Sequence, residues 1–244
     1  MKAFLLSAGL GTRLRPITDR VPKCLLPVDG RPLMAYWLDL FDRHGVTDVL
    51  VNTHHLRDSV ERFLAETAGS WNVRVRTSHE PELLGSAGTV SGHRDWVATS
   101  DPFLICYGDN LTNADLTHIV DAHRQGNELL TMGLFEASDP TACGIATLDA
   151  HGIVQAFEEK PRHPQSRWAN AGIYVASPPV LEYIHTDDRD LAHDVLPKLV
   201  GRMRGAPVRG YLRDIGTFES FAIAQIDWRG RASGPVVSPK QSRS

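Results

Sequence analysis

Compact apolar runs alternate with amphipathic segments along the first half of the chain. The runs predict buried strands, and they read KAFLLS, VTDVLVNT, PFLICYGD and ELLTMGLF, with NVRVRTSH alternating as a half-buried strand does. The segments between them predict helices, and they read RPLMAYWLDLFDRHG, LRDSVERFLAET, residues Ala87 to Val97, and ADLTHIVDAHRQG. This repeated strand-then-helix order predicts an α/β fold with one doubly wound, mainly parallel, Rossmann-like sheet and helices on both faces.

The pattern changes in the second half of the chain. GIATLDAHGIVQAFEEK reads as two strands joined by a tight turn at residues 150–152, and ANAGIYVAS reads as a further strand. LAHDVLPKLVGR predicts a helix that Pro197 and Gly201 disturb. We therefore expect one domain over residues 1–228 with a smaller β-rich portion, and a disordered tail over 229–244, which is small, polar and proline-bearing.

Composition narrows the class of protein. The 244 residues are 42% apolar and 23% charged, as in an ordinary soluble domain. The formal net charge of −3 offers no general attraction to nucleic acid or to an anionic membrane, so an anion site has to be a local cluster of basic groups. No apolar run is long enough to span a bilayer, and the first residues lack the apolar core of a signal peptide. Cys24, Cys106 and Cys143 form no CxxC pair and are typical of free thiols, so we expect a cytoplasmic protein.

A glycine-containing turn follows the first predicted strand, in LLSAGLGTRLRP at residues 5–16. Gly9 and Gly11 allow the backbone to approach a ligand closely, and the N–H groups of such a loop can point at phosphate oxygens. The dinucleotide fingerprint GxGxxG is not met, because Leu14 stands at its third glycine, and no Walker string occurs. These differences argue against an NAD-dependent oxidoreductase.

Basic residues surround this turn. Arg13 and Arg15 bring fixed positive charge suited to bidentate phosphate contacts, and Lys23 supplies a further cation. The alternative is a solvated turn whose basic side chains pair with Asp19 and Asp29. Phosphate binding is the interpretation we prefer, because glycines and cations occur together.

Several separate strings then occur in one order, and they read SAGLGTRLRPITDRVPKCLLPV, EPELLGSAGT, YGDN, CGIATLD, FEEKP, NAGIY and DIGT. Together they resemble the sugar-1-phosphate nucleotidyltransferases, and the similarity is greatest to the short mannose-1-phosphate guanylyltransferase-like members. The resemblance covers nearly the whole chain, residues 1–225. It implies that the smaller β-rich portion binds the sugar.

The resemblance implies a Mg²⁺ site made by Asp109 and Asp214. Asp109 ends a predicted strand, so its carboxylate faces the ligand side of the sheet, and Asp214 comes from a distant segment that can meet it there. Mg²⁺ takes oxygen ligands and keeps substrate phosphates and water, so two aspartates suffice; Asn110 is a further donor beside them. Taken singly, each aspartate reads equally well as the cap of a turn.

For the nucleotide, the resemblance implies contacts from Ala8, Gly9, Gly11, Thr12, Arg13, Lys23, Glu80, Gly85, Gly88 and Asp109. Guanine presents two adjacent donors that a carboxylate such as Glu80 can accept, whereas an amide suits uracil or thymine better. Glu80 therefore favours GTP, with UTP and dTTP as alternatives. Two further possibilities stay open, that Glu80 or Glu82 faces solvent or that a backbone carbonyl reads the base.

For the sugar, the resemblance implies Gly144, Glu159, Lys160 and Asn170, with Lys160 on the phosphate and Glu159 on hydroxyls. Neighbours on a strand point to opposite sides, so Glu159 and Lys160 share a site only if the strand twists or ends there. Isolated, the same tripeptide EEK reads as a solvated charge run. Mannose 1-phosphate is the expected acceptor, and a heptose or cyclitol phosphate meets the same phosphate contacts.

The implied reaction needs no protein nucleophile, because a phosphate oxygen of the sugar 1-phosphate attacks the α-phosphorus and pyrophosphate leaves. The catalytic residues are then Arg13 on pyrophosphate, Lys23 on the nucleotide phosphates and Lys160 on the attacking phosphate. A non-catalytic nucleotide-sugar sensor is the other alternative, although a sensor has no need of this set. The histidines, His54 and His55 among them, fit no zinc spacing and are read as loop residues. Oligomeric state is left open, with a homo-oligomer among the options.

Overall fold

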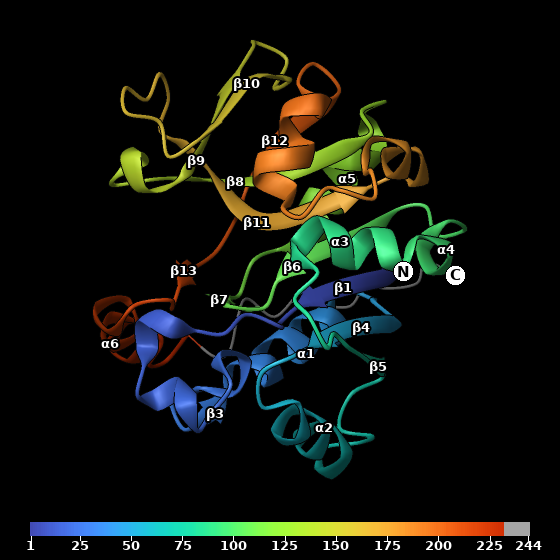
Figure 1. Cartoon of the computed structure of the whole chain (residues 1–244). Helices are drawn as coiled ribbons and strands as arrows, with labels where there is room; N and C mark the ends of the chain where they lie inside the picture. Colours follow the sequence, from blue (N-terminus) through green and yellow to red (C-terminus); the bar gives the residue numbers. More distant parts are fainter. Residues whose placement is uncertain (232–244) are drawn as a thin grey trace, which may run out of the picture.

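A mixed sheet forms the centre of the molecule in the computed structural model, which describes residues 1–231 (Figure 1). Its parallel core consists of β1 (Lys2–Leu6), β4 (Asp48–Thr53), β5 (Arg74–His79) and β6 (Phe103–Tyr107). Strand β1 pairs in parallel with both β4 and β6, and β4 pairs in parallel with β5. The apolar runs of β1, β4 and β6 are buried on both sides, which explains why they lack strict alternation, whereas β5 at the sheet edge is largely exposed.

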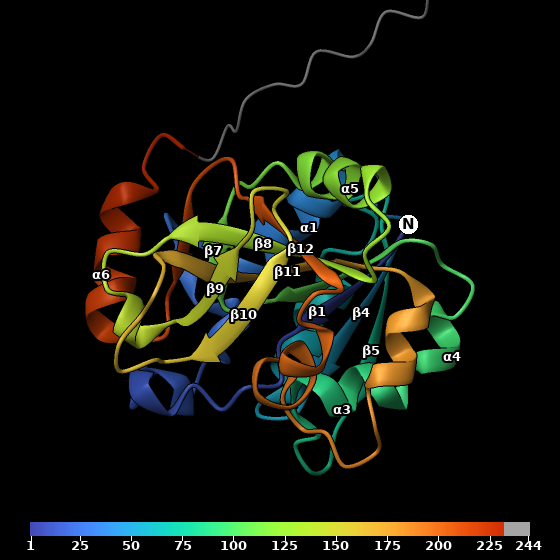
Figure 2. The same cartoon turned by 90° about the horizontal axis from the view of Figure 1, so that it is seen from above.

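The second half of the chain extends the sheet with mainly antiparallel strands. They are β8 (Leu130–Glu136), β9 (Gly144–Leu148), β10 (Val154–Glu159), β11 (Trp168–Ala176) and β12 (Met203–Pro207). Strand β11 pairs antiparallel with β6, β8 and β9, and β9 and β10 form the predicted hairpin. Strand β12 pairs in parallel with β8. This group is the predicted β-rich portion, seen above the parallel core in Figure 1 and in front of it in Figure 2.

Helices cover both faces of the sheet, as the sequence predicts. They are α1 (Leu33–Arg43), α2 (Arg57–Glu66), α3 (Gly85–Gly92), α4 (Arg94–Val97), α5 (Leu116–Gln125) and α6 (Phe218–Asp227). Ala3 and Leu5 of β1 pack in the cluster that contains α1 and α5, whereas Phe4 packs on the opposite face against α3 and α4. No helix among residues 1–231 is long and apolar enough to cross a membrane.

Two predicted helices differ from the structure. The helix expected from Ala87 to Val97 is divided into α3 and α4 at His93, whose amide closes a turn on the carbonyl of Val90 at 3.2 Å. The glycines of α3 weaken a continuous helix at this point. The helix expected in LAHDVLPKLVGR is a π-helical turn followed by a 3₁₀ turn that contains Pro197. Most of the tail expected over 229–244 lies outside the described residues.

Short strands that the sequence analysis did not predict bring distant segments together. Strand β13 (Leu212–Asp214) pairs antiparallel with β7 (Asn110–Thr112), which sets Asp214 opposite Asn110. The amide of Ile215 also donates to the carbonyl of Asp109 at 3.2 Å. A second two-stranded ribbon joins β2 (Pro27–Val28) and β3 (Arg31–Pro32). The pairing of β7 with β13 places the two predicted metal ligands side by side.

Candidate active site

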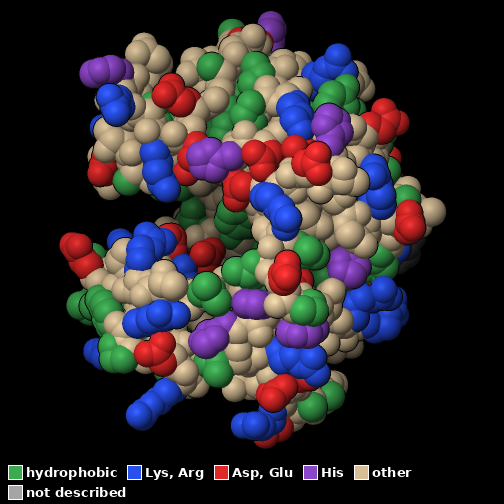
Figure 3. Space-filling view, in the orientation of Figure 1, with side chains coloured by type: hydrophobic (Ala, Val, Ile, Leu, Met, Phe, Trp, Pro, Cys, Tyr) green, Lys and Arg blue, Asp and Glu red, His purple; other side chains and the backbone are tan. Residues whose placement is uncertain are grey.

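Two adjoining cavities lie beyond the carboxyl ends of β1, β4 and β6. The first has a volume of about 270 Å³ and lies over these strand ends, and the second, of about 770 Å³, reaches toward β9, β10 and β11. Figure 3 shows the opening as a deep cleft with Lys and Arg side chains on both rims and acidic side chains inside. Three residues, Tyr107, Asp109 and Asp190, line both cavities and so mark their junction.

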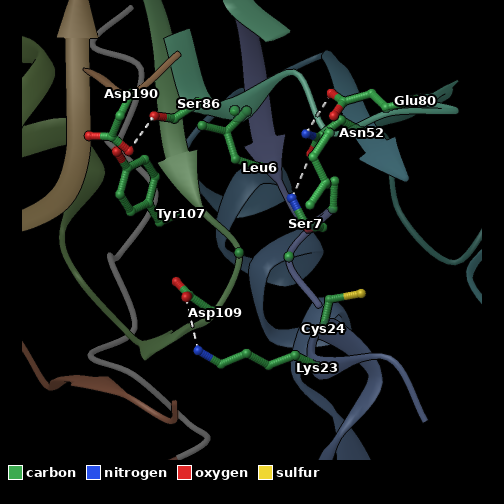
Figure 4. Close-up of a pocket in the computed structure, with 15 residues that line it drawn as sticks. Leu6, Ser7, Lys23, Cys24, Asn52, Glu80, Ser86, Tyr107, Asp109 and Asp190 are labelled. Atoms are coloured by element: carbon green, nitrogen blue, oxygen red, sulfur yellow. Dashed lines mark hydrogen bonds and ion pairs between the residues drawn. The ribbon is translucent and has the colours of Figure 1, made fainter. Parts of the chain in front are cut away.

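The glycine-containing loop forms one wall of the first cavity. After β1 the chain turns at Ser7, whose amide donates to Asn52 Oδ1 at 2.6 Å (Figure 4). Gly11 adopts the left-handed conformation at φ 62°, and its carbonyl accepts from Thr18 Oγ1 at 2.8 Å. A side chain at this position would be strained, and its Cβ would lie 2.9 Å from Thr18 Cγ2.

An ion cluster occupies the junction of the cavities. Lys23 Nζ lies 2.9 Å from Asp109 Oδ2, a contact drawn in Figure 4, and 3.0 Å from Asp214 Oδ1, so a single ammonium group bridges the two carboxylates. Arg13 Nη2 lies 3.8 Å from the other oxygen of Asp214. The Lys23 side chain is 9% exposed, whereas those of Asp109 and Asp214 are 41% and 53% exposed. The carboxylates therefore remain open to the cleft.

Burial alone would lower the pKa of Lys23, but the Asp109 and Asp214 carboxylates outweigh it, and the pKa is raised above its usual value. Lys23 is therefore a permanent cation at the junction. The oxygens of the two aspartates that converge on one point are bonded there to Lys23 Nζ, and each carboxylate is an oxygen donor of the kind that a hard divalent cation prefers. Within residues 1–231 no group of three or more His, Cys, Asp and Glu side chains converges in a metal-binding arrangement, and the Mg²⁺ site stays a prediction.

Glu80 lies in the first cavity, but its carboxylate is already bonded within the protein. Oε1 accepts from Asn52 Nδ2 at 2.9 Å and from Thr89 Oγ1 at 2.5 Å, and Oε2 accepts from the amide of Leu84 at 3.1 Å. Since each oxygen has two lone pairs, only Oε2 keeps an open acceptor position. The role of Glu80 in reading a base stays a prediction, with room for one of the two guanine donors on its carboxylate.

All of the predicted sugar residues line the second cavity, namely Gly144, Glu159, Lys160 and Asn170. Strand β10 ends at Glu159, and Lys160 has a left-handed φ of 51°. The turn away from strand geometry lets both side chains face one cavity, with Lys160 Nζ 3.7 Å from Glu159 Oε1. Asn170 Nδ2 donates to Tyr174 Oη at 2.6 Å, and Asn170 Oδ1 accepts from the amide of Gly172 at 3.0 Å.

Some predicted nucleotide residues lie elsewhere in the structure. Arg13 lines the second cavity, on the side of Asp214, and not the first. Thr12 is exposed and lines neither cavity. Gly88 packs against Leu84, and a Cβ there would lie 3.1 Å from Leu84 Cβ. Arg15 pairs with Asp19 at 3.2 Å on the surface, as the solvated-turn alternative predicts for that residue.

The three cysteines are free thiols, as expected. Cys24 and Cys106 are buried, and Cys143 is partly exposed. Burial raises the pKa of Cys24 to about 12, so this thiol stays protonated although it lines the first cavity. It therefore serves there as a small apolar side chain.

Among the residues that line the cavities, Asn52, Asp190 and His193 lie outside the predicted motifs, and Tyr107 opens the string YGDN without an assigned role. Asn52 and Tyr107 end buried strands, which is a usable signal, because the ligands of such sheets lie beyond the carboxyl ends. Asp190 and His193 belong to an irregular segment whose approach to the site depends on tertiary contacts. No local pattern identified them.

The fold and the site define an α/β protein with a two-part cleft in which basic side chains lie beside a pair of carboxylates. The family model described as nucleotidyl transferase matches residues 2–229, and the chain belongs to this family. The resemblance to sugar-1-phosphate nucleotidyltransferases is confirmed.

The relatives have different substrates. The catalytic subunit beta of mannose-1-phosphate guanylyltransferase from Xenopus tropicalis is 29% identical over 225 residues, covering 91% of this chain and 62% of the relative. A UTP–glucose-1-phosphate uridylyltransferase from Synechocystis is 33% identical over 215 residues, covering 82% and 55% respectively. This chain thus spans less than two thirds of these relatives. A solved Bacillus anthracis protein, assigned as a glucose-1-phosphate thymidylyltransferase and in complex with sucrose, has a TM-score of 0.82 at 26% identity, covering 94% of this chain and 96% of its own.

Proposed function

We propose that the chain transfers a nucleoside monophosphate from a nucleoside triphosphate to a sugar 1-phosphate, with GTP and mannose 1-phosphate as the favoured pair. The observation that carries this proposal is the contact of Lys23 with Asp109 and Asp214 at 2.9 and 3.0 Å, at the junction of two cavities. Lys160 lines the second cavity together with Arg13, Asp109 and Asp214. Two anionic substrates would therefore meet where the cations and the acids converge.

The work of these residues is to hold two mutually repelling polyanions in line. A bound Mg²⁺ ion, for which Asp109 and Asp214 are the ligands present, supplies positive charge to the triphosphate and the leaving pyrophosphate. Lys23 neutralises the nucleotide phosphates, Arg13 binds the departing pyrophosphate at the mouth of the cleft, and Lys160 orients the acceptor phosphate. The acceptor is already an anion at neutral pH, so no side chain has to remove a proton from it.

Two observations support guanine and mannose. Relatives named as mannose-1-phosphate guanylyltransferases match 91% of the chain, and Glu80 keeps one acceptor position inside the first cavity. Uridylyl transfer to glucose 1-phosphate is the second candidate, because the Synechocystis uridylyltransferase shares 33% identity with this chain. The two candidates share every phosphate contact and differ only in the base and the sugar.

A substrate panel tests the proposal. The purified chain is incubated with Mg²⁺, each nucleoside triphosphate in turn and a set of hexose and heptose 1-phosphates, and pyrophosphate is measured with and without excess chelator. We expect release only when both substrates and the metal are present, with GTP and mannose 1-phosphate the fastest pair. Pyrophosphate release with no pair would refute the proposed activity, and full turnover in excess chelator would refute the role of the aspartates.

Lys160→Ala is expected to raise the KM for the sugar 1-phosphate and to lower kcat by about 10²-fold, because the attacking phosphate loses its charged partner. The KM for the nucleotide should change little. The matched control is Arg162→Ala, which removes an exposed cation two residues away that lines neither cavity. Steady-state kinetics with each substrate varied in turn make the comparison, and unchanged kinetics in Lys160→Ala would remove this residue from the mechanism.

A further inference from the structure

Tyr107, the first residue of the string YGDN, and Asp190 stand at the junction of the two cavities, and the proposed reaction gives neither of them a role. They share this position only with Asp109, one of the two predicted metal ligands. Figure 4 shows both side chains on the opposite side of the first cavity from Glu80 and Asn52. A residue in contact with both cavities can influence how one substrate affects the other.

Asp190 is hydrogen-bonded to the wall of the first cavity, where the proposed function places the nucleotide. Ser86 Oγ of α3 donates to Asp190 Oδ2 at 3.2 Å, and the amide of Leu191 donates to Ser86 Oγ at 2.8 Å (Figure 4). Ser86 also lines the first cavity. The hydroxyl group thus fastens the start of α3 to the segment that carries Asp190.

The backbones of these two segments are also in close contact. The amide of Ala87 donates to the carbonyl of Arg189 at 3.0 Å. Gly85 has a φ of 79°, and a Cβ there would lie only 2.2 Å from that same carbonyl oxygen. The loop that leads into α3 and the segment from Arg189 to Leu191 therefore form one wall.

The other oxygen of Asp190 is hydrogen-bonded to the wall of the second cavity, where the proposed function places the sugar 1-phosphate. Oδ1 accepts from the amides of Ala192 at 2.8 Å and His193 at 3.0 Å. Both of these residues line the second cavity. One carboxylate therefore connects the wall of the first cavity with the wall of the second.

Tyr107 provides a second observation at the same place. Its hydroxyl is buried and, among the described residues, has no hydrogen-bond partner. Like Asp190, this side chain lines both cavities.

We propose that Asp190, assisted by Ser86 and Tyr107, is a positioning residue that makes the two substrates bind cooperatively. The inference rests on the proposed function. A ligand in either cavity contacts the wall that Asp190 holds together, so the wall arrangement that favours one ligand also favours the other. The coupling is reciprocal, because each substrate has to raise the affinity of the other by the same factor.

Isothermal titration calorimetry measures this coupling without turnover. Mannose 1-phosphate is titrated into the chain with Mg²⁺, in the presence and absence of the α,β-methylene analogue of GTP, which cannot release pyrophosphate. If the panel selects uridine, the corresponding UTP analogue and glucose 1-phosphate are used. We expect the analogue to tighten sugar-phosphate binding by about fivefold or more in the unmodified chain, and by less than about twofold in Asp190→Asn and Ser86→Ala.

The controls separate coupling from simple structural damage. Asp187→Asn changes an exposed carboxylate of the same segment that lines neither cavity, and it should keep the full coupling. Tyr107→Phe removes the unpartnered hydroxyl, so it should keep the melting temperature while losing coupling. Asp190→Asn also removes a negative charge near two phosphates, so each separate affinity can rise while the coupling falls.

Independent binding of the two ligands to the unmodified chain would overturn the inference and leave the proposed function intact. Coupling that persists in Asp190→Asn would also overturn it. Failure of both ligands to bind the unmodified chain would overturn the proposed function, and this inference with it.

Discussion

Asp109→Asn and Asp214→Asn are each expected to lower kcat for pyrophosphate release by about 10³-fold. Each carboxylate lies within 3.0 Å of Lys23 Nζ, so both lie beside the cation that the proposed function assigns to the nucleotide phosphates. Removing either one leaves a single anionic ligand for a divalent cation. The double variant should be little worse than either single variant, because the two residues act as one unit.

The fold should tolerate these changes. Lys23 keeps one carboxylate partner in each single variant, and the side chains of Asp109 and Asp214 are 41% and 53% exposed. Asp121→Asn, on the exposed surface of α5, is the matched control and should keep full activity. A kcat within tenfold of the unmodified chain in either single variant would contradict the assignment of these carboxylates.

Lys23→Met should lower kcat/KM for the nucleotide by about 10²-fold, because the nucleotide phosphates lose a buried cation. It should also lower the melting temperature in the absence of metal. Asp109 and Asp214 would then face each other without the ammonium group that lies 2.9 and 3.0 Å from them. Millimolar Mg²⁺ should therefore raise the melting temperature of Lys23→Met more than that of the unmodified chain.

Lys198→Met is the control for this change. Lys198 also forms an ion pair, with Asp188 at 2.7 Å, but it lines neither cavity. It should lose some stability, with no change in kcat/KM and no extra response to Mg²⁺. An equal Mg²⁺ response in Lys23→Met and in the unmodified chain would argue that the cation does not bind between the two aspartates.

Most of the site could be predicted, because its motifs follow strand ends of one sheet. Gly9, Lys23 and Asp109 come from segments at the carboxyl ends of parallel strands or just beyond them, and these ends meet at a common edge. The strand-then-helix order was readable from local apolar patterns alone. Gly144 and Lys160 were recognised only through the family resemblance, since neither carries a distinctive local signal.

The rest depended on contacts that no local pattern records. Strands β7 and β13 are three residues each, too short for periodicity, yet their pairing brings Asp214 to Asp109. Strand alternation allows Glu159 and Lys160 to share a site only if the strand twists or ends between them. Strand β10 ends at Glu159, and the left-handed backbone of Lys160 turns its side chain into the same cavity. Asp190 lies at the site because its segment is hydrogen-bonded to Ser86 of α3, and such a tertiary contact is not visible in the sequence.

The central claim is that one cleft holds both substrates across the Asp109–Asp214 pair and transfers the nucleotidyl group directly. Exchange of labelled pyrophosphate into the nucleoside triphosphate, in the absence of any sugar 1-phosphate, tests this claim most directly. Direct transfer predicts no label in the triphosphate until the nucleotide sugar product is supplied. Rapid exchange without a sugar would reveal a covalent enzyme–nucleotidyl intermediate, and it would contradict the account.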